Sequence, residues 1–217
     1  MKEKIKDFII KNWKWIVLFI CLIGFLELAE DVFNKEIMNG DIIGYKIIST
    51  FLISDFATPI AKFITNFGGA IFIILLTVIL IAVIKNKKIG LSILANLAII
   101  TILNQLLKRI LQRPRPTEYR IIEESGYSFP SGHSMISMAF YGYLIYLIYK
   151  YVENKNAKWI LISLLSVLIC LIGISRIYLG VHYTSDVLGG FLISISYLVI
   201  YISAVNNVFC RKEEKYK

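Results

Sequence analysis

Long uncharged apolar stretches dominate the chain, and short charged segments separate them. Five of these stretches cover residues 63–84, 89–107, 134–149, 159–175 and 187–210. A helix needs about 20 apolar residues to cross a bilayer. The pattern therefore predicts five membrane-spanning helices.

A sixth span is predicted from a weaker signal near the start of the chain. Residues 15–26 carry no charge, but Lys14 precedes them and Glu27 follows them. Charged side chains that flank a span can reach the interface, so we expect a helix to cross here as well. The alternative is a cleaved signal peptide. A cleavage site after Ala29 would need a small residue at position 27, where the chain has Glu27, and this disfavours the alternative.

The segment between the first two spans is too polar to cross a membrane. The pairs Ile42-Ile43 and Ile47-Ile48 lie between Asp41, Lys46 and Asp55. This mixture over residues 32–55 predicts an amphipathic helix at the interface. Thr58 and Pro59 then suggest the N-cap and first residue of the second span.

Composition agrees with a single membrane-embedded domain over residues 1–217. Of the 217 residues, 57% are hydrophobic and 18% are charged, and the mean hydropathy is +0.69. These values exclude disorder and disfavour a soluble fold. The formal charge of +9 does not indicate nucleic acid, because the basic residues lie between apolar runs. Three widely separated cysteines imply neither a disulfide framework nor a metal cluster.

The distribution of basic residues predicts the orientation in the membrane. Lysine-rich segments precede residue 15, occupy residues 85–88 and 150–158, and end the chain. The positive-inside rule assigns all four to the cytoplasm, together with both termini. Residues 108–133 then lie outside although they are basic, which suggests an anionic ligand. The basic residues of this outer segment are Lys108, Arg109, Arg113, Arg115 and Arg120.

Three polar clusters at the predicted outer helix ends carry the candidate chemistry. They cover residues 108–116, 130–133 and 175–186, and they contain both histidines of the chain, His133 and His182. One histidine could attack phosphorus while the other protonates the departing oxygen. Asp186 follows His182 by one helical turn, so its carboxylate could orient the imidazole. The groups suited to a phosphate are the side chains of Lys108, Arg115, Arg176 and Ser131 and the amide of Gly132.

Plainer interpretations apply to several of the same residues. Arg109 and Arg120 are expected to anchor lipid headgroups, and Arg113 could serve either as an anchor or as part of the site. The Ser131 hydroxyl could do no more than cap a helix. Glu123 and Glu124 are interpreted as a solvated loop, with a headgroup contact left open. Asn104 stands one turn before Lys108 and is expected to support it.

The three clusters together carry a family pattern. Lys108 with Arg115-Pro116 matches K-x6-R-P, residues 130–133 match P-S-G-H, and Ser175-Arg176 with His182 and Asp186 matches S-R-x5-H-x3-D. The chain therefore resembles the type 2 phosphatidic acid phosphatase superfamily.

The resemblance implies a role for each residue of the pattern. His182 is the nucleophile, oriented by Asp186, and forms a phosphohistidine; His133 is the acid for the leaving group and then the base for water. The phosphoryl oxygens are held by Lys108, Arg115, Ser131, Gly132 and Arg176. No metal and no other cofactor is expected.

The resemblance also implies an all-α enzyme of the plasma membrane whose active site faces outward. Undecaprenyl diphosphate, phosphatidylglycerol phosphate and phosphatidic acid all fit as lipid substrates, and no residue discriminates among them. Partners are therefore the lipid phosphate and membrane lipids, with no nucleic acid and no obligate protein. Vanadium haloperoxidases share the pattern but are soluble. A small transporter or scaffold with an anion site is the alternative from another class, and the main polar residues within a span are Asn96, Asn104 and Gln105.

Overall fold

The chain folds entirely into helices and connecting segments over the residues that the structure describes. The computed structural model describes residues 2–36 and 38–214, which form eight α-helices and no strand. The helices are α1 (Lys2–Phe33), α2 (Asn39–Phe51), α3 (Ala57–Asn66), α4 (Ala70–Val83), α5 (Lys87–Leu111), α6 (Gly132–Tyr151), α7 (Lys155–Tyr178) and α8 (Thr184–Glu214). The all-α prediction is confirmed, whereas Lys215 and Lys217, two of the lysines assigned to the cytoplasm, lie outside the described residues.

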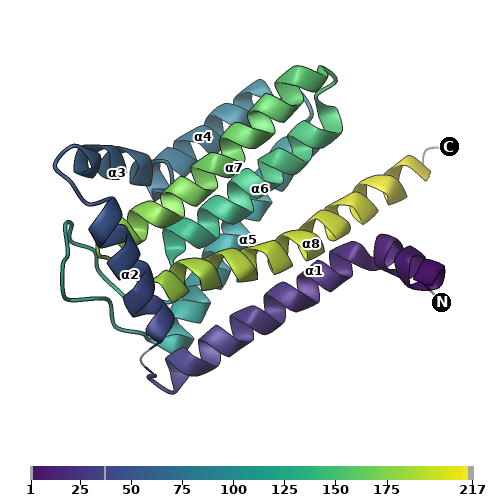
Figure 1. Cartoon of the computed structure of the whole chain (residues 1–217). Helices are drawn as coiled ribbons and strands as arrows, with labels where there is room; N and C mark the ends of the chain where they lie inside the picture. Colours follow the sequence, from purple (N-terminus) through teal and green to yellow (C-terminus); the bar gives the residue numbers. More distant parts are fainter. Residues whose placement is uncertain (1, 37, 215–217) are drawn as a thin grey trace.

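Helix α6 lies at the centre of the bundle, where α5, α7 and α8 pack against it. Helix α1 runs beside α8, and the bent pair α3–α4 packs on α7 and α5. The first and last helices reach one end of the molecule together, while α2 and the long α5–α6 connection lie at the opposite end (Figure 1). The polar clusters of the sequence belong to this second end.

The interior of the bundle combines apolar packing with neutral hydrogen bonds. Phe140 and Ile172 are fully buried. The Tyr143 hydroxyl donates to Ser92 Oγ at 2.8 Å, and the Tyr201 hydroxyl donates to the Ser92 carbonyl at 2.5 Å. The exterior is apolar instead, with Ile71 80% exposed. An apolar exterior over an interior whose polar groups are mostly hydrogen-bonded suits a helical bundle in a bilayer.

Three of the described helices are long and apolar enough to cross a membrane. They are α5, α7 and residues 184–208 of α8, and α3 with α4 would make a fourth if the bent pair were one span. Within the described residues, α1 with 32 residues and α6 with 20 are long enough, but they are not among the helices that combine this length with sufficient apolarity. The six-span topology and the cytoplasmic termini therefore stay predictions.

The second predicted span differs from the expectation in two ways. It is broken at residues 67–69 into α3 and α4, whose axes differ by 48°. Gly68 permits this break to pack closely on α7, since a Cβ there would lie 2.7 Å from Ile172 Cγ2. The predicted N-cap at Thr58 is wrong, because α3 begins at Ala57 and Ser54 Oγ accepts from its amide at 3.2 Å.

A helix, α2, occupies residues 39–51 of the segment 32–55 that was predicted to form an amphipathic helix. Its isoleucines at positions 42, 43 and 47 are each more than half exposed. Asp41 and Ile48, one side of the helix, are buried against the protein. The helix therefore turns a carboxylate inward, toward the end of the molecule that carries the polar clusters.

Candidate active site

A cavity of about 470 Å³ opens where α5, α6 and the α3–α4 break meet the α5–α6 connection and the α7–α8 turn. Residues from all three polar clusters line it: Lys108, Arg115, Gly132, His133 and His182. The fold thus brings together segments that are more than 70 positions apart in the chain.

Local structure explains how each element presents its residues. Lys108 lies in the last turn of α5, and Gly132 and His133 open α6. His182 lies in the short α7–α8 turn, where Gly180 has a φ of 69° and a Cβ would meet the Tyr119 carbonyl at 2.3 Å. This turn requires glycine both for its left-handed backbone and for the close approach.

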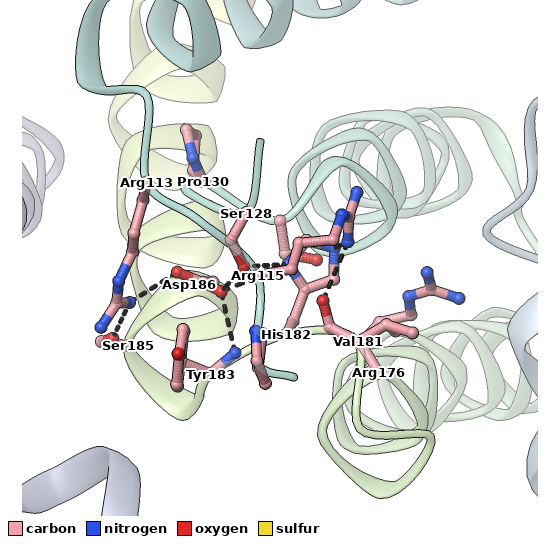
Figure 2. A network of polar contacts seen from close by, with 12 residues as sticks. Arg113, Arg115, Ser128, Pro130, Arg176, Val181, His182, Tyr183, Ser185 and Asp186 are labelled. Atoms are coloured by element: carbon pink, nitrogen blue, oxygen red, sulfur yellow. Dashed lines mark hydrogen bonds and ion pairs between the residues drawn. The ribbon is translucent and has the colours of Figure 1, made fainter. Parts of the chain in front are cut away.

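Each ring nitrogen of His182 has a partner (Figure 2). Nδ1 lies 3.3 Å from Asp186 Oδ2, and Nε2 lies 3.0 Å from Arg115 Nη1. A carboxylate at Nδ1 favours the tautomer with its hydrogen on that atom. The lone pair on Nε2 then points toward the Arg115 guanidinium.

Asp186 is held on both carboxylate oxygens. Oδ2 accepts from the Tyr183 amide at 2.8 Å and also from the Ser128 hydroxyl. Oδ1 accepts from Arg113 Nη1 at 2.6 Å. Ser128 was missed by the sequence analysis; it is fully buried and its hydroxyl also lies 3.2 Å from His182 Nδ1.

Burial keeps the His182 imidazole neutral. Loss of solvent lowers its pKa to about 4, although the hydrogen bond and charge of Asp186 act in the opposite direction. A neutral imidazole with a fixed tautomer keeps on Nε2 the unprotonated lone pair that a nucleophile needs, which here faces Arg115.

The three candidate cations have partners that carry full or partial negative charge. Lys108 Nζ donates to the Tyr127 carbonyl at 2.5 Å, and Arg115 Nη1 donates to the Val181 carbonyl at 2.9 Å. Arg176 donates to Thr65 Oγ1 at 2.7 Å and stands behind the cavity lining. Its side chain is 1% exposed, and its Nε has no hydrogen-bond partner among the described residues.

Glu124 is not the solvated residue that the sequence suggested. Its Oε2 lies 2.5 Å from Arg176 Nη2, and its side chain is 32% exposed at the cavity. Partial burial opposes ionisation, but Arg176 prevails and lowers the pKa of Glu124. Glu123 does match that interpretation, with its side chain 93% exposed.

Two other residues contact the start of α6. Ser131 caps the helix, with its Oγ accepting from Ser134, and it does not line the cavity. Its phosphate-binding role stays a prediction. Asn104 donates to the Pro130 carbonyl at 3.2 Å instead of supporting Lys108, because α6 begins directly beside it.

The remaining arginines of the connection separate into different environments. Arg113 forms ion pairs with Asp186 and Asp41 at 2.6 Å each, and it lines a second cavity beside α2 rather than the one that His133 lines. Arg120 donates to the Pro116 carbonyl, and Arg109 is exposed at the cavity rim. The anchoring roles of Arg109 and Arg120 stay predictions.

In the part of the chain that the structure describes, no group of three or more His, Cys, Asp or Glu side chains is placed to hold a metal ion. The carboxylates at the site are paired with arginines instead. Independence of metal stays a prediction for experiment.

Comparison with known proteins identifies the family. The family model described as PAP2 superfamily matches residues 89–210, which contain every predicted catalytic and phosphate-binding residue. The chain belongs to the PAP2 superfamily. The PAP2 match extends from α5 into α8 and so includes the whole cavity lining except Gly68 and Ala70.

Relatives of this PAP2 chain are lipid phosphatases. It is 38% identical to phosphatidylglycerophosphatase B of Bacillus subtilis over 133 residues, which are 59% of this chain and 65% of that protein, just under two thirds of its length. It is 26% identical to an undecaprenyl-diphosphatase of Sulfolobus acidocaldarius over 208 residues, 90% of this chain and 93% of the relative. The crystal structure of a transmembrane PAP2-type phosphatidylglycerolphosphate phosphatase from Bacillus subtilis superimposes with a TM-score of 0.76 at 28% identity, covering 88% of this chain and 96% of that one.

Proposed function

We propose that this chain is an integral membrane lipid phosphatase that removes a phosphate from a lipid phosphate or diphosphate through a phosphohistidine intermediate. The observation that carries the proposal is the contact of Arg115 Nη1 with His182 Nε2 at 3.0 Å. A phosphoryl group held by that guanidinium lies next to the lone pair that would attack it.

His182 carries out the first step and His133 assists it. Nε2 attacks phosphorus, the bond from phosphorus to the leaving oxygen breaks, and His133 gives that oxygen a proton. His133 then takes a proton from water, which attacks the phosphohistidine and releases inorganic phosphate. Both histidines line the same cavity, which supports their action on one phosphate. Burial, and then the charge of Arg176, lower the pKa of His133 to about 2, so its role as the acid requires the bound phosphate to raise that pKa.

Lys108, Arg115 and Arg176 neutralise the phosphoryl oxygens, and the Gly132 amide and Ser131 complete the set at the start of α6. Three cations can stabilise the charge of the transition state, a task that magnesium performs in other phosphatases. We therefore expect full activity in excess chelator and inhibition by vanadate. Loss of activity with chelator, restored by a divalent ion, would contradict this.

The substrate is a lipid whose phosphate lies at the membrane surface. The printed names of two relatives, a phosphatidylglycerophosphatase and an undecaprenyl-diphosphatase, support two of the three candidate lipids. Purified protein should be assayed in detergent against undecaprenyl diphosphate, phosphatidylglycerol phosphate and phosphatidic acid. Phosphate release from at least one is expected; phosphate binding without turnover would favour the transporter or scaffold.

We propose further that six spans place the site on the outer face of the plasma membrane. Glu123 belongs to the α5–α6 connection, which lies at the end of the molecule away from the start of α1 and the end of α8 (Figure 1), and Tyr183 lies at the site (Figure 2). Single cysteines at either position, in a background without native cysteines, should react with an impermeant thiol reagent in intact cells. Labelling only after lysis would reverse the orientation.

A further inference from the structure

A buried charge network extends from the catalytic histidine to α2. Arg113 lies between two carboxylates, with Nη1 2.6 Å from Asp186 Oδ1 and Nη2 2.6 Å from Asp41 Oδ2. The side chains of Arg113, Asp41 and Asp186 are 11%, 6% and 0% exposed. Breaking a buried pair by removing one partner leaves a charge without compensation, so these contacts constrain one another strongly.

Further contacts fix the network from the start of α8. The Ser185 amide donates to Asp41 Oδ1 at 2.7 Å, and its hydroxyl donates to Asp41 Oδ2 at 2.9 Å. Arg113 also donates to that hydroxyl at 2.7 Å, and its guanidinium lies 4.1 Å from the centre of the Tyr183 ring. The guanidinium therefore has a single position in which it meets both carboxylates.

The two ion pairs have opposite effects on His182. Arg113 holds the carboxylate of Asp186 in the orientation that reaches Nδ1. A guanidinium bound to Asp186 alone would also neutralise it and weaken its support of the positive imidazole that forms on phosphorylation. Asp41 takes part of the charge of Arg113, so Asp186 keeps the negative charge that stabilises that state.

We propose that Asp41 and Arg113 are positioning residues for phosphoryl transfer, acting on His182 through Asp186. This inference rests on the proposed phosphatase function. It assigns a catalytic contribution to α2, a helix outside the matched family region, and to an arginine outside the three motif patterns.

The test measures phosphohistidine formation separately from binding. Rapid-quench kinetics on the full chain, with nitrophenyl phosphate, would compare Arg113→Gln, Arg113→Lys, Asp41→Asn and the double variant Asp41→Asn/Arg113→Gln. Loss of a residue that orients an active-site side chain by hydrogen bonding typically lowers activity by about 10-fold to 100-fold. We expect Arg113→Gln to slow phosphorylation by about that factor and Asp41→Asn by about 10-fold, with unchanged vanadate inhibition.

Two further results are expected from the network. The proposal has Asp41 act on Asp186 through Arg113 more than through Ser185, so the double variant should be little slower than Arg113→Gln, a non-additivity that independent structural damage would not produce. Arg113→Lys should recover part of the rate, because a cation remains beside Asp186. Glu123→Gln, an exposed carboxylate on the same connection, is the matched control and should behave as wild type.

The outcomes separate the inference from the function on which it rests. Wild-type protein without phosphatase activity would overturn both. An active wild type with Asp41→Asn and Arg113→Lys both as fast as Glu123→Gln would overturn the inference alone. A parallel loss of vanadate binding in folded variants would show a binding defect and also overturn it. If Arg113→Gln does not fold, Asp41→Asn and Arg113→Lys decide the matter.

Discussion

The two sides of His182 are built on different principles. On the Nδ1 side, Asp186, Arg113 and Asp41 form a closed network whose charged partners are buried side chains. On the Nε2 side, Lys108 and Arg115 donate mainly to backbone carbonyls of the α5–α6 connection and the α7–α8 turn, and Arg176 pairs with the part-exposed Glu124.

The formal charges on the Nε2 side suit the binding of a phosphate. Lys108, Arg115 and Arg176 face one carboxylate, Glu124, an excess of two positive charges on the Nε2 side to which Arg109 at the exposed rim adds a third. A phosphate group carries about two negative charges. The Nδ1 side is preorganised and orients the nucleophile, whereas the Nε2 side has partners that an incoming anion can replace.

The largest effect is expected from removing His133, the proposed acid for the leaving group and base for water. His133→Ala should lose about two to four orders of magnitude in activity on lipid substrates, because an alkoxide or phosphate leaving group needs a proton. Vanadate inhibition should remain, since the cations are intact. Steady-state rates on the three lipids, with vanadate titrations as the control, would check this; near wild-type lipid turnover would contradict it.

Arg176→Lys tests the Nε2 side by keeping charge and removing geometry. A lysine cannot contact Thr65, Glu124 and a phosphoryl oxygen at once with a planar fork. We expect kcat to fall by about 100-fold, in the range found when one preorganised donor is lost. The matched control is Arg109→Lys at the exposed rim, which should be nearly neutral. Equal rates for the two variants would show that charge alone suffices.

Glu124→Gln, unlike the two variants above, should strengthen anion binding on the Nε2 side. Phosphate has to compete with this carboxylate for Arg176, so its removal should tighten vanadate inhibition. A partly exposed ion pair contributes about 0.2–1 kcal/mol, which corresponds to at most about fivefold in affinity. Inhibition constants for Glu124→Gln and Glu123→Gln would be compared. Weaker vanadate binding in Glu124→Gln alone would show that Glu124 organises the site rather than competing for it.

The smallest expected effect concerns pH: the rate of phosphorylation of His182 should hardly change between pH 7 and pH 5. With its pKa lowered to about 4, His182 should remain neutral from pH 7 to pH 5 and lose its lone pair only near pH 4. An imidazole of ordinary pKa near 6.5 would instead lose about 30-fold of its neutral form at pH 5. The burst rate of His133→Ala with nitrophenyl phosphate, corrected for substrate ionisation, reports this group. A fall centred near pH 6.5 would contradict the buried, neutral state.

Sequence reasoning predicted the residues around the cavity well, because each motif combines a rare residue type with a helix end. Lys108, Arg115, Gly132, His133 and His182 line one cavity as the clusters implied. The approach of Asp186 to His182 followed from their helical spacing.

Contacts between distant segments were beyond the same reasoning. Asp41 read as a polar break in an apolar helix, and its partner Arg113 is 72 positions away. Glu124 read as solvated because nothing local reveals that Arg176 lies beside it. The break between α3 and α4 was missed because an apolar run does not show where Gly68 must pack against α7. A lone acidic residue in a membrane-associated helix was the available signal for Asp41.

The measurement that tests the central claim most directly is the identity of the phosphorylated histidine. His133→Ala and His182→Ala proteins would be mixed with nitrophenyl phosphate, quenched within the burst, and analysed for acid-labile phosphate by mass spectrometry. We predict phosphate on His182 of the His133→Ala protein, because nitrophenolate leaves without a proton, and none on the His182→Ala protein. Phosphate trapped on His182→Ala and absent from His133→Ala would reverse the two roles and contradict the account.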